Sequence, residues 1–210
     1  MILHGYWRSG TSYRTRIALN LKGLAYEQVA VDLRAGDQRG ERFRALNPQG
    51  MVPALETADG VLTQSPAILE WLEERYPDPP LLPRGANDRA VVRAMAATIA
   101  CDIHPLNNLR VLKAVRALDS VEGADNRWAG RWIGDGFAAL EVQIARHGRG
   151  FAFGDTPTFA DCHLVPQVYS AERFEVDLSP YSRLTAAAEH ARAHPAIAAA
   201  HPDRQPDADR

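Results

Sequence analysis

The first part of the chain alternates short strand-like runs with helix-like runs. A half-buried strand places apolar residues at every second position, whereas a surface helix places them three and four residues apart. These spacings predict strands at residues 2–6, 26–33, 52–56 and 61–63, and helices at residues 11–22, 39–46 and 65–76. Asp59-Gly60 marks a hairpin turn between the last two strands. The expected order is therefore β-α-β-α-β-β-α, with Ser65 as the N-cap of the last helix.

The second part of the chain has helical spacing almost throughout. The interruptions are the loops and the His104-Pro105 pair, and the pattern predicts helices at residues 88–118, about 130–146, 158–173 and 184–194. Thr158 and Asp161 have the spacing of a capping box, in which two side chains satisfy the first N–H groups of a helix.

A linker separates the two parts. Four prolines and a glycine within residues 76–85 prevent regular hydrogen bonding, so we place the boundary near residue 82. We expect an α/β domain over residues 1–82 and an all-α domain over residues 88–210. Residues 201–210 are polar and contain two prolines, and we expect them to be mobile.

Composition narrows the class of protein. The 210 residues are 46% hydrophobic and 24% charged, which is typical of a globular protein with a buried core. A net charge of −2 argues against a nucleic-acid partner. The chain lacks the roughly 20-residue apolar run of a membrane span and a signal-peptide pattern, so we expect a soluble, cytoplasmic protein without a membrane partner. Cys101 and Cys162 are too few for a disulfide framework and lack metal-ligand spacing, so no metal site is expected.

The turn between the first strand and the first helix is the leading candidate for chemistry. Such turns present backbone N–H groups and the positive end of the helix to an anion. Ser9, Thr11 and Ser12 lie here, but no cysteine does, so the protein itself is not expected to exchange disulfides. The turn could instead donate hydrogen bonds to a thiolate that a cosubstrate supplies. The alternative is that Ser9 or Ser12 only caps the helix.

Two further segments are candidates for binding. Pro53 begins a strand, and a cis Val52-Pro53 bond would leave the backbone groups of Val52 free to pair with an extended peptide. Gln64 and Ser65 precede a helix whose N-terminus is suited to a carboxylate, with plain capping as the alternative.

Polar residues also gather around the interruption of the first long helix in the second part. Asp102, Leu106 and Arg110 are four residues apart and would share one face if the helix resumes. Arg110 and Arg173 would ordinarily be surface charges, and a histidine beside a proline, as at His104, is more often structural. Arg8 directly precedes Ser9 and is therefore a stronger candidate.

These residues resemble a known family. The segment Ser9-Gly10-Thr11-Ser12-Tyr13-Arg14-Thr15-Arg16-Ile17-Ala18-Leu19 is similar to the family signature Ser-Ser-Cys-x-x-Arg-x-Arg-Ile-Ala-Leu. Further likeness lies in Leu46-Asn47-Pro48, Val52-Pro53, Gln64-Ser65, Leu164-Val165-Pro166-Gln167-Val168, Ala171-Glu172-Arg173-Phe174 and Val176-Asp177-Leu178. On nearly its whole length the chain resembles the zeta-class glutathione transferases, which include maleylacetoacetate and maleylpyruvate isomerases.

The resemblance implies a thioredoxin-like N-terminal domain, an all-helical C-terminal domain, a homodimer, and glutathione as cofactor. It implies that Ser9 hydrogen-bonds the glutathione sulfur and that Val52, ahead of cis Pro53, pairs with the cysteinyl backbone. Gln64 and Ser65 would hold the γ-glutamyl carboxylate. The remaining residues that we assign to the glutathione site are Gly10, Thr11, Asp102, His104 and Asn108. Gly10 and Thr11 replace the second serine and the cysteine of the signature, so no role of that cysteine can operate here.

The family's chemistry is reversible addition of the glutathione thiolate to a cis double bond of a small dicarboxylate. Arg8, Arg110 and Arg173 would then bind the substrate carboxylates and the developing enolate, as catalytic groups beside Ser9. Ser9-Gly10-Thr11 and Asp102-Ile103-His104-Pro105 look more like the maleylpyruvate isomerases of gentisate breakdown than the maleylacetoacetate isomerases of tyrosine degradation. The alternatives are a general transferase that conjugates or dehalogenates α-halo acids, and a non-catalytic interaction module.

Overall fold

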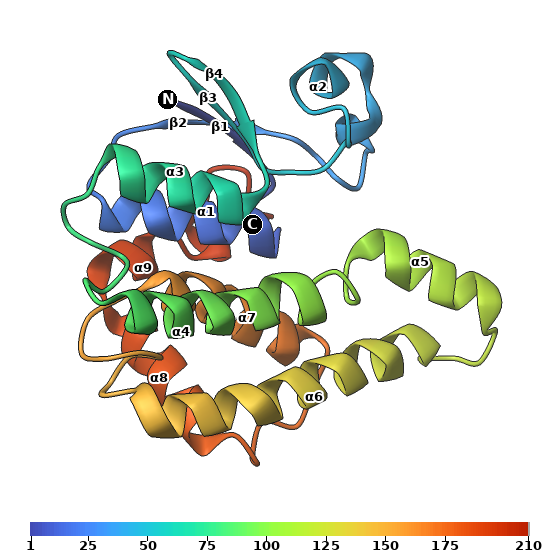
Figure 1. The fold of residues 1–210 in the computed structure, drawn as a ribbon. Helices are drawn as coiled ribbons and strands as arrows, with labels where there is room; N and C mark the ends of the chain where they lie inside the picture. The colour runs from blue at the N-terminus through green and yellow to red at the C-terminus, as the bar shows by residue number, and fades with distance from the viewer. Residues whose placement is uncertain (210) are drawn as a thin grey trace. The chain divides into compact units, whose positions relative to one another are not determined.

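The computed structural model describes residues 1–209, which form two compact units (Figure 1). The sheet unit comprises Met1–Pro80 together with the segment from His194 onward, and the helical unit comprises Leu81–Ala193. The chain thus leaves the sheet unit inside the predicted proline-rich linker.

The sheet unit has the predicted thioredoxin-like order of elements, with boundaries shifted by up to three residues at each end. Its four strands are in the order β2-β1-β3-β4, with β1 parallel to β2 and the other pairs antiparallel. The elements are β1 (Ile2–Gly5), α1 (Gly10–Leu21), β2 (Glu27–Ala30), α2 (Glu41–Leu46), β3 (Ala54–Thr57), β4 (Gly60–Thr63) and α3 (Ser65–Arg75).

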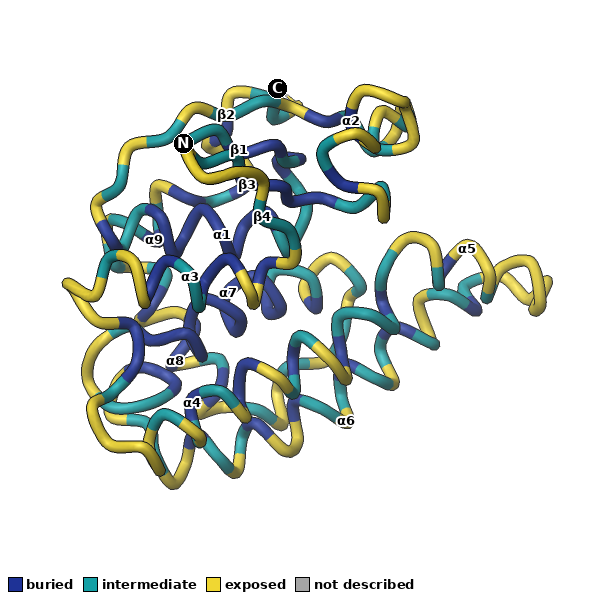
Figure 2. The backbone as a smooth tube through the Cα atoms, turned by 45° about the horizontal axis from the view of Figure 1, so that its top comes forward, coloured by how far each residue is buried: buried dark blue, intermediate teal, exposed yellow. Residues whose placement is uncertain are grey.

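The helix α1 forms the centre of this unit. It lies beside α3 on one face of the sheet (Figure 1), and it is buried from Ser12 to Leu19 (Figure 2). Burial on several sides explains why its apolar residues do not form a single stripe and why polar residues of α1 lie in the interior. Residues that precede and follow the N-terminus of α1 are therefore held by a rigid support.

The helical unit has the interruption expected at His104-Pro105, but the regular helix before it ends earlier than expected, and the helix predicted from about residue 130 begins at residue 124. The predicted helix over residues 88–118 is divided into α4 (Ala86–Ala97), a π-helical turn (Thr98–Ile103) and α5 (Leu109–Leu118), and the other helices are α6 (Ala124–His147), α7 (Phe159–Arg173) and α8 (Ser182–Ala193). Asn108 caps α5 by accepting the N–H of Arg110 at 3.1 Å. Because a new helix begins at this cap, the condition under which Asp102, Leu106 and Arg110 would share one helical face is not met.

The C-terminal segment contradicts two expectations. A short helix α9 (Pro195–Ala199) and the residues after it pack in the sheet unit rather than in an all-helical domain that extends to residue 210. The Asn20 side chain donates to the Ala196 carbonyl at 3.0 Å, and the Arg16 guanidinium donates to the Ala200 carbonyl at 3.1 Å. Further along, Gln205 accepts from Gln28, Asp207 from the Trp7 N–H and Asp209 from Arg34. Polar groups of residues 201–209 thus have partners in the sheet unit, contrary to the mobile segment that we expected. Arg210, also within the predicted mobile segment, lies outside the described residues.

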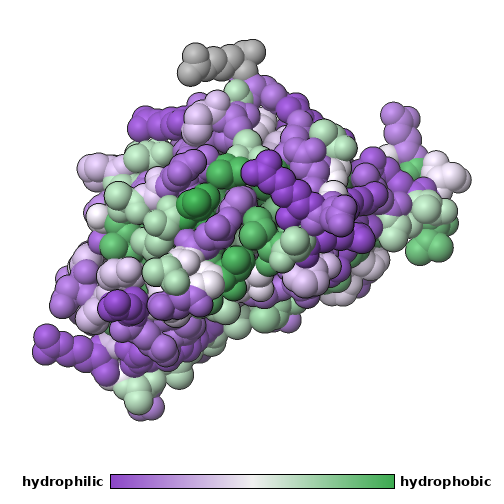
Figure 3. All heavy atoms as spheres, turned by 90° about the horizontal axis from the view of Figure 1, so that it is seen from above, coloured by the Kyte–Doolittle hydropathy of each residue, from purple (hydrophilic) through white to green (hydrophobic). Residues whose placement is uncertain are grey.

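Polar residues cover most of the face shown in Figure 3, and apolar side chains gather in a smaller area near its middle. Within residues 1–209, no helix has the length and apolar character needed to cross a membrane.

Candidate functional site

The candidate site begins at the N-terminus of α1. Ser9 is the N-cap of this helix, and its Oγ accepts the N–H of Ser12 at 3.3 Å. The Ser9 N–H donates to the Tyr6 carbonyl at 3.0 Å, which closes a tight turn over Tyr6–Ser9. The capping role that the sequence allowed is therefore present, and it fixes the Ser9 hydroxyl beside the free N–H groups of the helix end.

Three groups form a directed chain of hydrogen bonds at this end. The Thr11 hydroxyl donates to the Val52 carbonyl at 2.9 Å, and Ser9 Oγ lies 2.9 Å from Thr11 Oγ1. A hydroxyl has one proton, and the carbonyl oxygen can only accept. The Thr11 hydroxyl therefore donates its proton to the Val52 carbonyl, and the Ser9 hydroxyl donates to Thr11 Oγ1.

The Val52-Pro53 peptide bond is cis, as predicted. The expectation that both backbone groups of Val52 remain free is wrong, because the carbonyl accepts the Thr11 hydroxyl. The Val52 N–H has no hydrogen-bond acceptor within the described part of the chain. One donor at this position is thus available to a ligand.

The start of α3 also differs from the prediction. Its first helical hydrogen bond runs from the Ile68 N–H to the Gln64 carbonyl at 3.0 Å, so Gln64 and not Ser65 is the N-cap. Gln64 has a φ of 67°, in the left-handed region that side chains rarely adopt, and its side chain makes no capping bond. The Ser65 side chain is buried, and its Oγ has no hydrogen-bond partner among residues 1–209. This helix end thus has unused donors.

The strand register brings these features together. Ala54 pairs with Thr63 at the end of the β3–β4 hairpin, so Val52-Pro53 and Gln64-Ser65 both lie just beyond this pair. The bond from Thr11 to Val52 joins them to the turn that carries Ser9. The sheet unit therefore assembles a helix N-terminus, a backbone N–H and a second helix N-terminus, which together suit an extended ligand with a carboxylate and an anionic group.

The candidate cations lie in different parts of the molecule. Arg8 is in the sheet unit, where its guanidinium lies 5.2 Å from the centroid of the Trp7 ring and forms no ion pair with a described residue. Arg110 and Arg173 are exposed residues of the helical unit. The Arg173 guanidinium lies 6.0 Å from each of the ring centroids of Tyr169 and Phe174.

The other predicted glutathione residues fall in two places. Gly10 is the first residue of α1 and lies between Ser9 and Thr11. Asp102, His104 and Asn108 belong to the helical unit, in the π-helical turn and the segment before α5. A close approach shapes this region, because a Cβ at Gly136 of α6 would lie 2.3 Å from the Ile103 side chain.

Sequence reasoning missed two residues that contact the candidate site. Gln49 accepts a hydrogen bond from the Gln64 side chain at 2.7 Å, and Asp207 accepts the N–H of Trp7 at 3.0 Å. The proximity of Gln49 to Pro53 along the chain was an available signal for the first. The second had no local signal, because 200 positions separate Asp207 from Trp7.

Comparison with known proteins gives a consistent family. The family model described as glutathione S-transferase, N-terminal domain, matches residues 8–75. A maleylpyruvate isomerase of a Ralstonia species is 53% identical, with 99% of each chain covered. A maleylacetoacetate isomerase of Pseudomonas aeruginosa is 50% identical, with 99% of this chain and 98% of the relative covered.

Solved structures agree with this result. A holo structure of maleylpyruvate isomerase, described as a bacterial glutathione transferase of the zeta class, has a TM-score of 0.97 and 51% identity over 100% of both chains. A maleylacetoacetate isomerase of Methylobacterium extorquens, solved with bound malonate and glutathione, has a TM-score of 0.95 and 39% identity, also over 100% of both chains. The chain belongs to the zeta-class glutathione transferase family.

Proposed function

We propose that the protein is a glutathione-dependent cis–trans isomerase of maleylpyruvate or maleylacetoacetate. The observation that carries the proposal is the set of unused donors at the ends of α1, β3 and α3, in a chain that is 50% identical or more to isomerases of both substrates. One related structure holds glutathione with malonate and another holds dicarboxyethyl glutathione with citrate, which supports the same cofactor and a small carboxylate substrate here.

The donors in the sheet unit fit the polar groups of glutathione. A buried hydroxyl without an acceptor costs free energy, and a ligand carboxylate at Ser65 removes that cost. Ser65 and Gln64, at the N-terminus of α3, would hold the γ-glutamyl carboxylate. The free N–H of Val52 would pair with the cysteinyl backbone, as in strand addition. Gly10, Thr11, Asp102, His104 and Asn108 complete the proposed cofactor site.

When bound, glutathione supplies a thiolate that adds reversibly to the cis double bond, so that rotation about the resulting single bond is possible. Ser9 and the N-terminus of α1 favour the ionised thiol. Lowering a thiol pKa by about 1.5 units needs about 2 kcal/mol of preferential stabilisation of the thiolate. A helix N-terminus contributes about 0.3–1 kcal/mol and a hydrogen bond to a charged group about 1.5–3 kcal/mol, so the two suffice without a general base.

Three arginines would act on the substrate. Arg8 adjoins Ser9 in the chain and has no competing ion pair among the described residues, so its guanidinium is free to bind a carboxylate. Arg110 and Arg173 would add positive charge from the helical unit, where it favours the enolate that develops during addition. We assign maleylpyruvate as the preferred substrate, in agreement with the Ser9-Gly10-Thr11 and Asp102-Ile103-His104-Pro105 segments.

The test is to mix the purified protein and glutathione with each substrate and to follow the enol absorbance together with the concentration of free thiol. We expect the trans product to form while the thiol concentration stays constant, with a higher kcat/KM for maleylpyruvate. Stoichiometric loss of thiol would show a conjugating transferase instead. Absence of glutathione binding in calorimetry would contradict both activities and favour an interaction module.

We further propose that the protein acts as a homodimer, as the family resemblance implies, and that it is located in the cytoplasm. Light scattering coupled to size exclusion should give twice the mass of one chain. A single-chain mass at micromolar concentration would contradict the dimer, and a fractionation that finds the protein in another compartment would contradict the location.

A further inference from the structure

The turn that carries Arg8 and Ser9 depends on hydrogen bonds to residues outside the turn. In the Tyr6–Ser9 turn, Trp7 and Arg8 are the two central residues, and the turn's own hydrogen bond uses neither the N–H nor the carbonyl of Trp7. Both groups are in a buried residue and need partners. The residues that bond to the Trp7 N–H and carbonyl therefore determine the orientation of the turn.

Both partners depend on the C-terminal segment. The Asp207 carboxylate accepts the Trp7 N–H at 3.0 Å. The Trp7 carbonyl accepts the Arg16 guanidinium at 2.8 Å, and the same guanidinium donates to the Ala200 carbonyl at 3.1 Å. Asp207 therefore contacts Trp7 directly, through a charge-assisted hydrogen bond, whereas Ala200 acts on Trp7 through Arg16.

The segment that carries Asp207 is itself anchored. The Gln205 side chain donates to the Ala199 and His201 carbonyls at 3.1 and 2.7 Å, and accepts from Gln28 of β2 at 2.9 Å. Further along, Asp209 forms a two-pronged ion pair with Arg34, with bonds of 2.6 and 3.0 Å. These contacts on both sides of Asp207 fix its position along the sheet unit.

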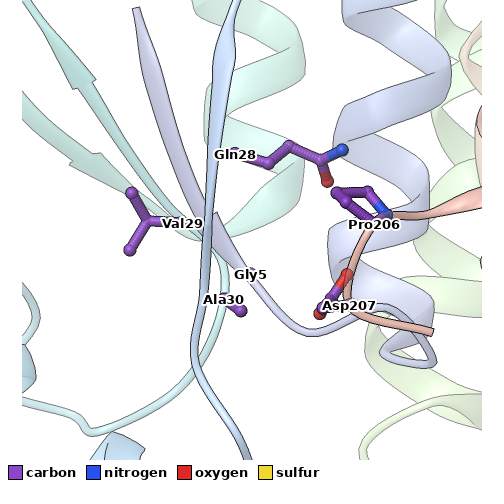
Figure 4. A pocket seen from close by; sticks show the side chains of 6 residues that line it. All are labelled: Gly5, Gln28, Val29, Ala30, Pro206 and Asp207. Carbon is purple, nitrogen blue, oxygen red and sulfur yellow. The ribbon is translucent and has the colours of Figure 1, made fainter. Parts of the chain in front are cut away.

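Packing links the segment to the site as well. Ala208 packs against the apolar cluster that contains Tyr6 and Trp7 of the turn and Val52, the residue before cis Pro53. Figure 4 shows Asp207 beside the loop that leaves β1, at the edge of a hollow of about 220 Å³ that Gln28 and Pro206 also line.

We propose that Asp207 is a positioning residue for the reaction, acting through the Trp7 backbone to hold Ser9 where it stabilises the thiolate. This inference rests on the role of Ser9 given under the proposed function. A turn released on its Trp7 side can rotate its central peptides, which displaces the Ser9 hydroxyl and the Arg8 side chain together. The C-terminal segment thus contributes to the electrostatics of the site through the backbone of Trp7.

The experiment compares Asp207→Ala with Asp207→Asn by titrating the thiolate absorbance of bound glutathione. Asn keeps an oxygen that accepts the Trp7 N–H, whereas Ala keeps none. For Asp207→Ala we expect the pKa of the bound thiol to rise by about 0.5 units or more and kcat/KM to fall about tenfold, more through kcat than through KM. Asp207→Asn should stay within about threefold of the wild type.

Asp203→Ala is the matched control, because Asp203 is an exposed carboxylate of the same segment whose nearest ionic partner is His201 at 3.7 Å. It should leave the thiol pKa unchanged. If Asp207→Ala fails to fold, Asp207→Glu, which shifts the carboxylate by one methylene, should raise the thiol pKa in the same way.

A thiol pKa in Asp207→Ala equal to that of the wild type, or in Asp207→Glu where the alanine variant does not fold, would overturn the inference. A wild-type protein that binds glutathione without lowering its thiol pKa would instead contradict the proposed role of Ser9. The two failures are therefore distinguishable in one set of titrations.

Discussion

The N-termini of α7 and α3 differ in how completely their polar groups are satisfied. At α7, Asp161 accepts the N–H groups of Thr158 and Ala152 and the Thr158 hydroxyl, at 2.8–3.0 Å. At α3, no side chain caps the helix, and the hydroxyl of Ser65 lacks a partner in the described structure. We call the N-terminus of α7 the closed end, because its polar groups have partners, and that of α3 the open end. A closed end stabilises the fold, whereas an open end costs stability and is suited to a ligand.

Breaking the closed end should have the largest effect. Asp161→Ala removes three buried hydrogen bonds and should lower the free energy of unfolding by about 3 kcal/mol, at about 1 kcal/mol for each bond. Urea unfolding at pH 7 measures this loss. A change below about 1 kcal/mol would show that water replaces the carboxylate and that the closed end is not a stability element.

The same carboxyl also predicts a pH dependence. Burial raises the pKa of Asp161 to about 6 from 3.8, although its hydrogen bonds act in the opposite direction. The folded protein therefore keeps a proton between pH 4 and pH 6 that the unfolded chain has released, and this contribution to stability falls as the pH rises through that window. The change amounts to about 3 kcal/mol. The stability difference between wild type and Asp161→Asn should decline from pH 4 to pH 6, and a difference that grows would contradict the raised pKa.

The N-terminus of α1 lies between these two cases, because Ser9 both caps the helix and is proposed to bind the thiolate. Ser9→Ala should lower kcat/KM about 10- to 100-fold, since a hydrogen bond to a charged group is worth about 1.5–3 kcal/mol. It should also raise the pKa of the bound thiol. The matched variant Ser9→Thr keeps a hydroxyl and a cap and should retain most activity. If the Ala and Thr variants lose activity equally, the hydroxyl is not the active feature.

Ser65→Ala sharpens the contrast at the open end. Removing a buried hydroxyl without a partner should leave the free energy of unfolding unchanged or raise it by up to about 1 kcal/mol. The Kd for glutathione should rise about 5- to 10-fold, by loss of one hydrogen bond to a carboxylate. Calorimetry and thermal unfolding on the same samples test both parts. Ser12→Ala is the control, because the Ser12 hydroxyl accepts the Tyr6 N–H and its loss should reduce stability.

The sequence predicts those features that depend on residues close together in the chain. The capping box of Thr158 and Asp161 and the order of strands and helices depend on residues a few positions apart, and these predictions are confirmed. The bond from Thr11 to Val52 spans 41 positions and the bond from Trp7 to Asp207 spans 200, so only the packed chain determines them. The same reason explains why polarity wrongly indicated a mobile segment at residues 201–209.

Substitution of Thr11 should have the smallest effect on the pKa of the bound thiol, and its direction distinguishes two roles for the Thr11 hydroxyl. Thr11→Val is nearly isosteric and removes the acceptor that holds the Ser9 proton in the directed chain. Ser9 then no longer divides its donation between Thr11 and the thiolate, so the pKa of the bound thiol should fall by a few tenths of a unit, opposite to Ser9→Ala. The Val52 carbonyl loses its partner at the same time, which should cost about 1 kcal/mol of stability.

Thr11→Cys, which restores the residue of the family signature, should lie between wild type and Thr11→Val in both measurements, because a thiol is a weak donor. A thiol pKa that rises in Thr11→Val would mean that Thr11 orients Ser9 toward the sulfur instead of competing for its proton.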